Sequence, residues 1–124
     1  MNLADVLAEV MPVETAADGA LTVRHNGTVA SLRKVVLAEG LPMISLTQVL
    51  AWDLPCNAHL RKTVAAQANL TMLGTVVLVE RPGRKADVML RYNFPGVGLR
   101  PGALRQLILM VLDTGAGVRR ELTG

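Results

Sequence analysis

Three residues whose side chains could form a nucleophilic unit, Asp53, Cys56 and His59, follow one another at intervals of three. A thiol becomes a strong nucleophile when an imidazole takes its proton and a carboxylate orients that imidazole. Pro55 interrupts the segment, however, and Cys56 precedes Asn57, the expected N-cap of a helix, so the three side chains need not share a helical face. A cysteine at such a strand-to-helix junction is typically a packed, unreactive thiol. We therefore expect no enzyme, with catalysis by Cys56 and His59 as the alternative.

The stretch YNFPGVGLRPGALRQL, residues 92–107, has glycines that could form a phosphate-binding loop. It does not match the dinucleotide fingerprint, because Pro101 stands where the third glycine is required, and it contains no Gly-Lys-Ser/Thr sequence. An anion could still bind the first turn of the following helix, with contacts from Gly98, Arg100 and Arg105. Proline is a common first residue of a helix, and the glycines permit a sharp reversal after a strand. We expect a connector here, and the alternative function is a small-molecule or anion sensor at residues 98–105.

The other residues that could carry chemistry are too few or too scattered to predict a site. His25 and His59 are the only histidines, and with one cysteine they supply too few ligands for a metal. The basic segment RPGRK, residues 81–85, could contact phosphates. Three aromatic residues in the whole chain, however, leave few side chains for stacking on single-stranded nucleic acid. We expect no metal, no cofactor and no nucleic-acid partner.

The composition is that of an aliphatic chain of the size of one domain. Of the 124 residues, 51% are hydrophobic but only 2% are aromatic, and the mean hydropathy is +0.37. A chain of this length buries roughly two-thirds of its unfolded surface without disulfides or metals. We therefore expect a single domain over residues 1–124. Because so apolar a chain has little polar surface to offer to water, we also expect a partner to cover part of it.

Charge and cysteine content favour the cytoplasm. The net charge of +3 is uneven, since residues 1–40 carry five acidic and three basic residues, whereas residues 81–105 carry six basic residues and one acidic residue. Such asymmetry favours acidic partners or the association of two copies. The single cysteine fits a reducing compartment, and the N-terminus lacks the basic start of a secretion signal. No apolar run reaches the ~20 residues needed to span a bilayer, so we expect a cytoplasmic protein without a membrane segment.

The first half of the chain predicts one helix followed by three strands. Apolar residues at helical spacing indicate the helix, with Asn2 as its candidate N-cap. Asn26-Gly27 predicts a tight hairpin with His25 in solvent at its tip. The third strand alternates between two faces, one of which should carry Ile44, Leu46, Gln48, Leu50 and Trp52. The predicted elements are a helix at 2–11 and strands at 20–25, 28–37 and 43–52.

The second half predicts a helix, a second hairpin and a last helix. The predicted elements are a helix capped by Asn57 and running to residue 70, strands at 72–80 and 86–94, and a helix from Pro101 to about Thr114. Gly-Ala-Gly and a short basic tail follow that helix. A bulge could intervene in the strand 86–94, so the face occupied by Tyr92 and Phe94 stays open. The order α-β-β-β-α-β-β-α predicts an α+β fold with a mainly antiparallel sheet and helices packed on it.

The last predicted helix is apolar on every side between residues 107 and 112. A helix that packs on a sheet needs only one apolar stripe. Either another layer of the same chain or a second subunit covers the other sides, and the small size of the chain favours the second subunit. The helix 57–70 offers a shorter apolar line. The candidate residues of a dimer or partner interface are Leu60, Val64, Ala68, Leu107, Ile108, Met110 and Val111.

Three phrases, DGALTV, LAWDLPCN and ADVMLRYNFPGVGL, together with the apolar helix that follows them, resemble the YbjN-like proteins of bacteria. Members of that family are described as sensory transduction regulators, and several are similar in fold to type III secretion chaperones. The resemblance covers about residues 15–114 and implies an antiparallel sheet with helices on one side and a homodimer that binds a client protein. It implies no catalytic residues. We therefore predict a non-catalytic, protein-binding, chaperone- or regulator-like homodimer in the bacterial cytosol.

Overall fold

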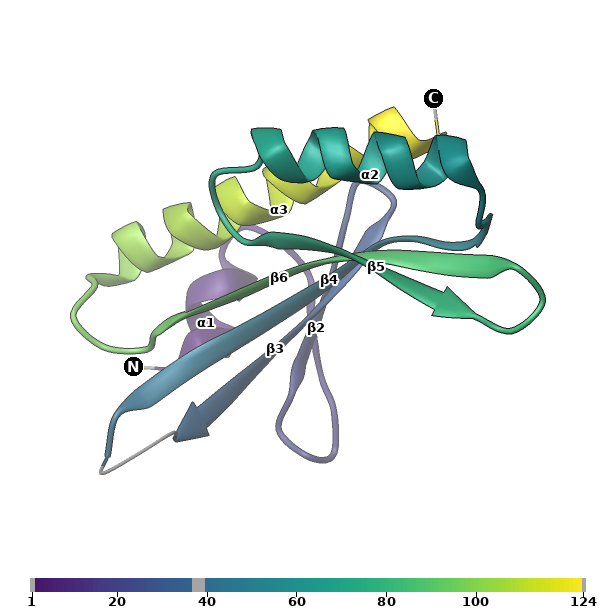
Figure 1. Ribbon diagram of the computed structural model, residues 1–124. Helices are drawn as coiled ribbons and strands as arrows, with labels where there is room; N and C mark the ends of the chain where they lie inside the picture. Colours follow the sequence, from purple (N-terminus) through teal and green to yellow (C-terminus); the bar gives the residue numbers. More distant parts are fainter. Residues whose placement is uncertain (1, 37–39, 124) are drawn as a thin grey trace.

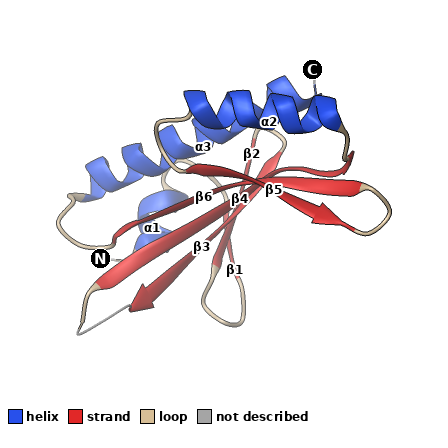
Figure 2. Cartoon of the chain, viewed as in Figure 1, coloured by secondary structure: helices blue, strands red, loops and turns tan. Residues whose placement is uncertain are grey.

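The computed structural model describes residues 2–36 and 40–123 and contains one six-stranded antiparallel sheet with three helices (Figure 1). The strand order across the sheet is β1-β2-β3-β4-β6-β5. Helices α2 and α3 lie over one face of the sheet (Figure 2), and side chains of all three helices join that face in a single apolar core. The elements are α1 (Leu3–Ala8), β1 (Val13–Thr15), β2 (Leu21–His25), β3 (Thr28–Val36), β4 (Pro42–Pro55), α2 (Ala58–Leu70), β5 (Thr75–Arg81), β6 (Lys85–Pro95) and α3 (Pro101–Thr123).

The predicted α+β fold is confirmed, with one additional strand. Residues 13–15 form β1, which pairs with β2 through Thr15 opposite Leu21, in a segment where the sequence predicted no strand. Three residues are too few to show the alternation that identifies a strand, and β1 forms because Val13 lies opposite the buried Val23 and adds to the core. The final residue of the predicted strand 28–37 lies outside the described residues.

The predicted start signals of the first two helices and of the first hairpin are confirmed. The side chain of Asn2 accepts a hydrogen bond from the Ala4 amide, and that of Asn57 accepts one from the Leu60 amide. Both asparagines therefore cap helices as their positions predicted. Asn26 and Gly27 have φ of 47° and 84°, which are the left-handed conformations that a tight primed hairpin turn requires.

Strand β4 contains irregularities that the alternation of its sequence did not predict. The pairing of β4 with β6 shifts between Val49 and Ala51 and again between Ala51 and Leu54. Leu50 and Ala51 are consequently both buried, and Trp52 is 50% exposed. The expectation that Trp52 shares the buried face with Leu50 is wrong, because the bulge reverses the alternation before it. The irregularity lies in β4 rather than β6, so Tyr92 and Phe94 stay on the face of the other core residues and their rings stack.

Helix α3 continues nine residues beyond the predicted end at Thr114 and includes the Gly-Ala-Gly segment. Glycines commonly end helices, which is why the sequence predicted a stop. Here Gly115 lies against the side chain of Gln48 on β4, so the missing Cβ allows the helix to approach the sheet closely. The sheet-facing stripe of α3 is buried and includes Leu104, Ile108, Val111, Leu112, Ala116 and Val118. Within residues 2–36 and 40–123, no helix has both the length and the apolar character that crossing a membrane requires.

Candidate interaction surfaces

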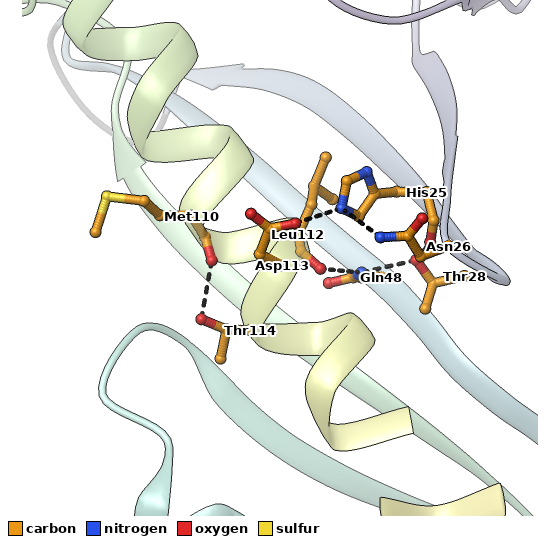
Figure 3. A network of polar contacts seen from close by, with 8 residues as sticks. All are labelled: His25, Asn26, Thr28, Gln48, Met110, Leu112, Asp113 and Thr114. Atoms are coloured by element: carbon orange, nitrogen blue, oxygen red, sulfur yellow. Dashed lines mark hydrogen bonds and ion pairs between the residues drawn. The ribbon is translucent and has the colours of Figure 1, made fainter. Parts of the chain in front are cut away.

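A buried polar network fixes the middle of α3 to the sheet (Figure 3). The amide nitrogen of Gln48 donates to the Thr28 hydroxyl at 2.8 Å and to the Leu112 carbonyl at 3.1 Å. The Gln48 side chain is completely buried, and no group of the described residues donates a hydrogen bond to its Oε1. Thr28 in turn donates to the carbonyl of His25 at 2.6 Å. The network lacks an exposed reactive group, and its role is to position the helix.

Two further contacts hold α3 on the sheet, one to the β2–β3 hairpin and one to β4. His25 lies 2.6 Å from the carboxylate of Asp113, with a side chain only 19% exposed (Figure 3). The expectation that His25 stands in solvent is therefore wrong, because α3 extends over the hairpin. Nearer the C-terminus, the guanidinium of Arg119 donates to the Leu50 carbonyl at 2.7 Å and lies over the ring of Trp52. These contacts explain why the segment predicted as a basic tail is helical.

The structure does not assemble Asp53, Cys56 and His59 into a catalytic unit. The Cys56 thiol donates to Glu80 at 3.5 Å and accepts a hydrogen bond from Arg61 at 3.4 Å, while the exposed His59 is not among its polar partners. Asp53 is turned away and pairs with Arg81. Partial burial and the hydrogen bond to Glu80 raise the pKa of the Cys56 thiol, so the protonated form prevails at neutral pH. Among the described residues, no group of three His, Cys, Asp or Glu could hold a metal ion.

The predicted anion contacts surround the start of α3. Gly98 has φ of 94° and open space beside it, and the carbonyl of Arg100 accepts the first helical hydrogen bond from Leu104. The guanidinium of Arg105 forms an ion pair with Glu9 and so fastens α3 to the end of α1. Arg105 therefore has a structural role, and an anion contact by Gly98 and Arg100 stays a prediction.

Most of the predicted interface residues lie inside the chain's own core. Leu60 and Val64 of α2 pack against the sheet, and Ile108 and Val111 of α3 are completely buried. Leu107 and Ala68 are half-buried, and only Met110 is widely exposed, at 50%. A second molecule would therefore meet the helices at Ala68, Leu107 and Met110, and the larger uncovered surfaces lie elsewhere.

The first of these surfaces is the edge of the sheet at β5, together with the end of α2. Strand β5 is the last strand of the sheet, and among the described residues no strand pairs with its outer side. Its sequence, TVVLVER, has four aliphatic residues in a row, three of them valines, and charges only at its end. Leu70 and Met72, which lead into β5, are 74% and 94% exposed. Below, "the β5 edge" denotes Leu70, Met72 and residues 75–81.

The second surface is the outer face of the sheet, opposite the helices. Val29, Val49, Met89 and Val77 lie on four neighbouring strands and pair in register, so they form a continuous apolar row across β3, β4, β6 and β5. All four side chains are half-buried by their neighbours alone. We call this set the outer row. Its strand positions were predicted correctly. The resemblance implied helices on one side of the sheet, but the alternation within the strands did not show which face they would leave uncovered.

The third surface is an open end on the helix side of the sheet, beside α1. Two cavities of about 420 and 330 Å³ lie there, and both include Leu3 and Lys34 in their linings. The connection between β6 and α3 forms one wall and exposes Val97 and Leu99. Lys34 belongs to the helix-side face because it pairs with the buried Ile44. Sequence analysis identified the connection but missed Lys34, since a lysine near a strand end usually points into solvent.

The sheet order and the element order define the fold class, which is that of the YbjN-like and secretion-chaperone-like proteins. The chain is similar in structure to YbjN of E. coli, a candidate transcription regulator, with a TM-score of 0.67 at 12% identity over 94% of this chain and 85% of that one. It is also similar to the Yersinia pestis type III secretion chaperone SycH, solved in complex with a fragment of YscM2. That TM-score is 0.54 at 13% identity, over 94% of this chain and 99% of that one. The predicted resemblance in fold is confirmed. No family model matches the chain, and no curated protein matches its sequence.

Proposed function

We propose that this chain is a non-catalytic protein-binding module that acts as a homodimer in the bacterial cytoplasm. The observation that carries the proposal is the β5 edge. A long, apolar strand edge is a template for pairing, and proteins usually protect such edges with proline, bulges, inward-pointing charges or short length. Residues 75–79 have none of these devices, and the only charges of β5 are at its end, Glu80 and Arg81.

In the proposed dimer, the β5 strands of two copies pair antiparallel across a two-fold axis. The same surface then meets itself, as a two-fold interface requires. Leu70 and Met72 of each copy lie at the ends of the paired strands and lose their contact with water. A standard interface covers roughly 800 Å² per partner. That area is about a tenth of the chain's accessible surface of 7366 Å².

The outer row supplies a place for a client protein. Pairing of two β5 strands joins the outer faces of two sheets, so the row Val29–Val49–Met89–Val77 of one copy continues toward that of the other. A row of half-buried aliphatic side chains accepts the apolar anchors that dominate protein recognition. The complex of the similar structure SycH with a fragment of YscM2 supports a protein partner. The raised pKa of Cys56 supports a role without catalysis.

Sedimentation equilibrium at micromolar concentration tests the dimer. We expect a mass of twice 13.2 kDa for the wild type and of one chain for the variant Leu70→Asp/Met72→Asp, which places four carboxylates in the interface. Because both side chains are exposed in the single chain, the variant should keep its fold. The matched control is Val36→Asp, an exposed apolar residue near the opposite end of the sheet, which should stay dimeric. A monomeric wild type contradicts the dimer.

Affinity purification from the native cell, followed by mass spectrometry, tests the client. We expect a stoichiometric protein partner that is lost in Val49→Lys/Met89→Lys and kept in Asn93→Lys, an exposed position on the same face of the sheet. A partner retained by both variants would place its site away from the outer row. Recovery of no partner protein would count against the binding function.

A further inference from the structure

The open end beside α1 combines an apolar cavity and a polar one. The larger cavity, about 420 Å³, is lined by aliphatic side chains that include Val6, Ile44, Leu99 and Leu104. The smaller, about 330 Å³, contains polar groups of Asn2, Asp18 and Arg33. Because both linings include Leu3 and Lys34, the two cavities meet at these residues. Their volumes fall within the range of roughly 300–1,000 Å³ typical of small-molecule sites, which are apolar with a few placed polar groups.

The shortness of α1 creates this opening. The helix has six residues and buries Leu3, Val6 and Leu7, so it covers only part of the sheet that faces it. Beyond it, the connection between β6 and α3 folds back at Gly96, whose amide donates to the Pro42 carbonyl at 2.9 Å. Val97 and Leu99 on this connection remain 58% and 44% exposed at the cavity. Within residues 2–36 and 40–123, the aliphatic walls of this cavity are formed and no side chain fills it.

Lys34 places a positive charge where the two cavities meet. It lies on the helix side of β3, beyond the buried Leu32 and opposite Ile44. Arg33, its neighbour, pairs with Asp18 at 2.8 Å, and Asp18 also accepts a hydrogen bond from the Ala20 amide. The paired charges of Arg33 and Asp18 offset each other, and Lys34 adds one positive charge to the lining that the two cavities share. An ammonium group next to an apolar cavity is complementary to an anion that carries an apolar chain.

We propose that this site binds an aliphatic carboxylate of about eight to ten carbons. The chain occupies the larger cavity, whose volume exceeds what about ten water-sized groups need at roughly 30 Å³ each. The carboxylate accepts hydrogen bonds from the Lys34 ammonium group at the mouth of the smaller cavity. The described residues that line the larger cavity are aliphatic, glycine, proline, methionine and Lys34, which favours a flexible chain over a planar ring. The proposal goes beyond protein binding and does not depend on it.

Titration calorimetry with hexanoate, octanoate and decanoate tests the site. We expect affinity to rise about fourfold per added methylene group, since each removes a similar apolar area from water. Lys34→Gln should weaken decanoate binding about tenfold, because a charge-assisted hydrogen bond is lost, and should leave decanol binding unchanged. Val97→Asp should weaken both ligands. The control Lys62→Gln, at an exposed position on α2, should change neither.

Lys34 and Val97 are exposed, so both variants should fold, and their circular dichroism spectra verify this. Chemical-shift mapping by NMR should locate decanoate at the amides of Leu3, Lys34 and residues 96–100 and 102–104. The proposal is overturned if decanoate gives neither a heat of binding nor chemical-shift changes with the folded wild type, because binding of an apolar chain can have an enthalpy near zero. It is equally overturned if Lys34→Gln and Val97→Asp bind decanoate as the wild type does, because the ligand would then lie elsewhere.

Discussion

Replacing Gly115 by alanine should destabilise the chain, although alanine favours helices. A Cβ at Gly115 would lie 2.0 Å from Oε1 and 2.4 Å from Cδ of Gln48, so the Gln48 side chain would have to move. Gln48 is completely buried, and moving it breaks its bonds to Thr28 and Leu112. Overpacking costs about 1–3 kcal/mol, and lost buried hydrogen bonds cost about 1–3 kcal/mol. Against this stands a gain of about 1 kcal/mol in helix propensity, which leaves a net loss of about 3 kcal/mol.

Urea unfolding followed by circular dichroism measures this loss against a matched control. Gly117→Ala adds the same Cβ two residues later, where the nearest atom is the flexible end of Arg120 at 3.5 Å. This control should be more stable than the wild type by up to about 1 kcal/mol. The double variant Gln48→Ala/Gly115→Ala should be more stable than the sum of its single changes predicts, because they share one space. A Gly115→Ala variant as stable as the control would refute the packing of α3 on Gln48.

Three further predictions concern single side chains. Gln48→Met should change the free energy of unfolding, measured in urea, by less than about 1 kcal/mol, because it removes an unpaired buried oxygen together with two hydrogen bonds. A loss of several kcal/mol would show that the polar network is indispensable. Cys56 should react with iodoacetamide at neutral pH more slowly than free cysteine. Glu80→Gln should accelerate the reaction, because it removes the carboxylate that accepts a hydrogen bond from the thiol. A fast wild-type thiol would support the catalytic alternative. The hydrogen bond from the Ala20 amide and, to a smaller extent, that from Arg33 lower the pKa of Asp18 below its ordinary value of 3.8. The contribution of Asp18 to stability is therefore present above pH 3.8 and is lost as the pH falls through the lowered pKa. Asp18→Asn should therefore unfold with a weaker acid dependence below about pH 4 than the wild type, and identical acid profiles would contradict the Asp18 contacts.

Local signals in the sequence were sufficient for most of the elements. The caps Asn2 and Asn57 and the turn Asn26-Gly27 act through neighbouring backbone groups, so their effect can be predicted without knowledge of the fold. The predicted stop at Gly-Ala-Gly failed because the requirement for glycine at position 115 comes from Gln48, a residue 67 positions away. Long-range packing of this kind leaves no local trace.

The candidate surfaces were harder to predict than the elements. The apolar lines of α2 and α3 suggested an interface, yet Leu60, Val64, Ile108 and Val111 are covered by the chain's own sheet. The outer row and Lys34 depend on which face the helices cover, and that follows from the connections between elements rather than from the alternation of each strand. The bulge in β4 similarly moves Trp52 out of the core, and only the pairing with β6 shows it.

Amide hydrogen exchange along β5 tests the proposed dimer most directly. We predict that in the wild type at micromolar concentration the amides of residues 75–79 are protected on both sides of the strand. In Leu70→Asp/Met72→Asp, the amides that point away from β6 should lose their protection, because only the hydrogen bonds to β6 remain. If the outward-facing amides of wild-type β5 exchange as fast as those of a free strand edge, the β5 edge is uncovered in solution and the proposed assembly is incorrect.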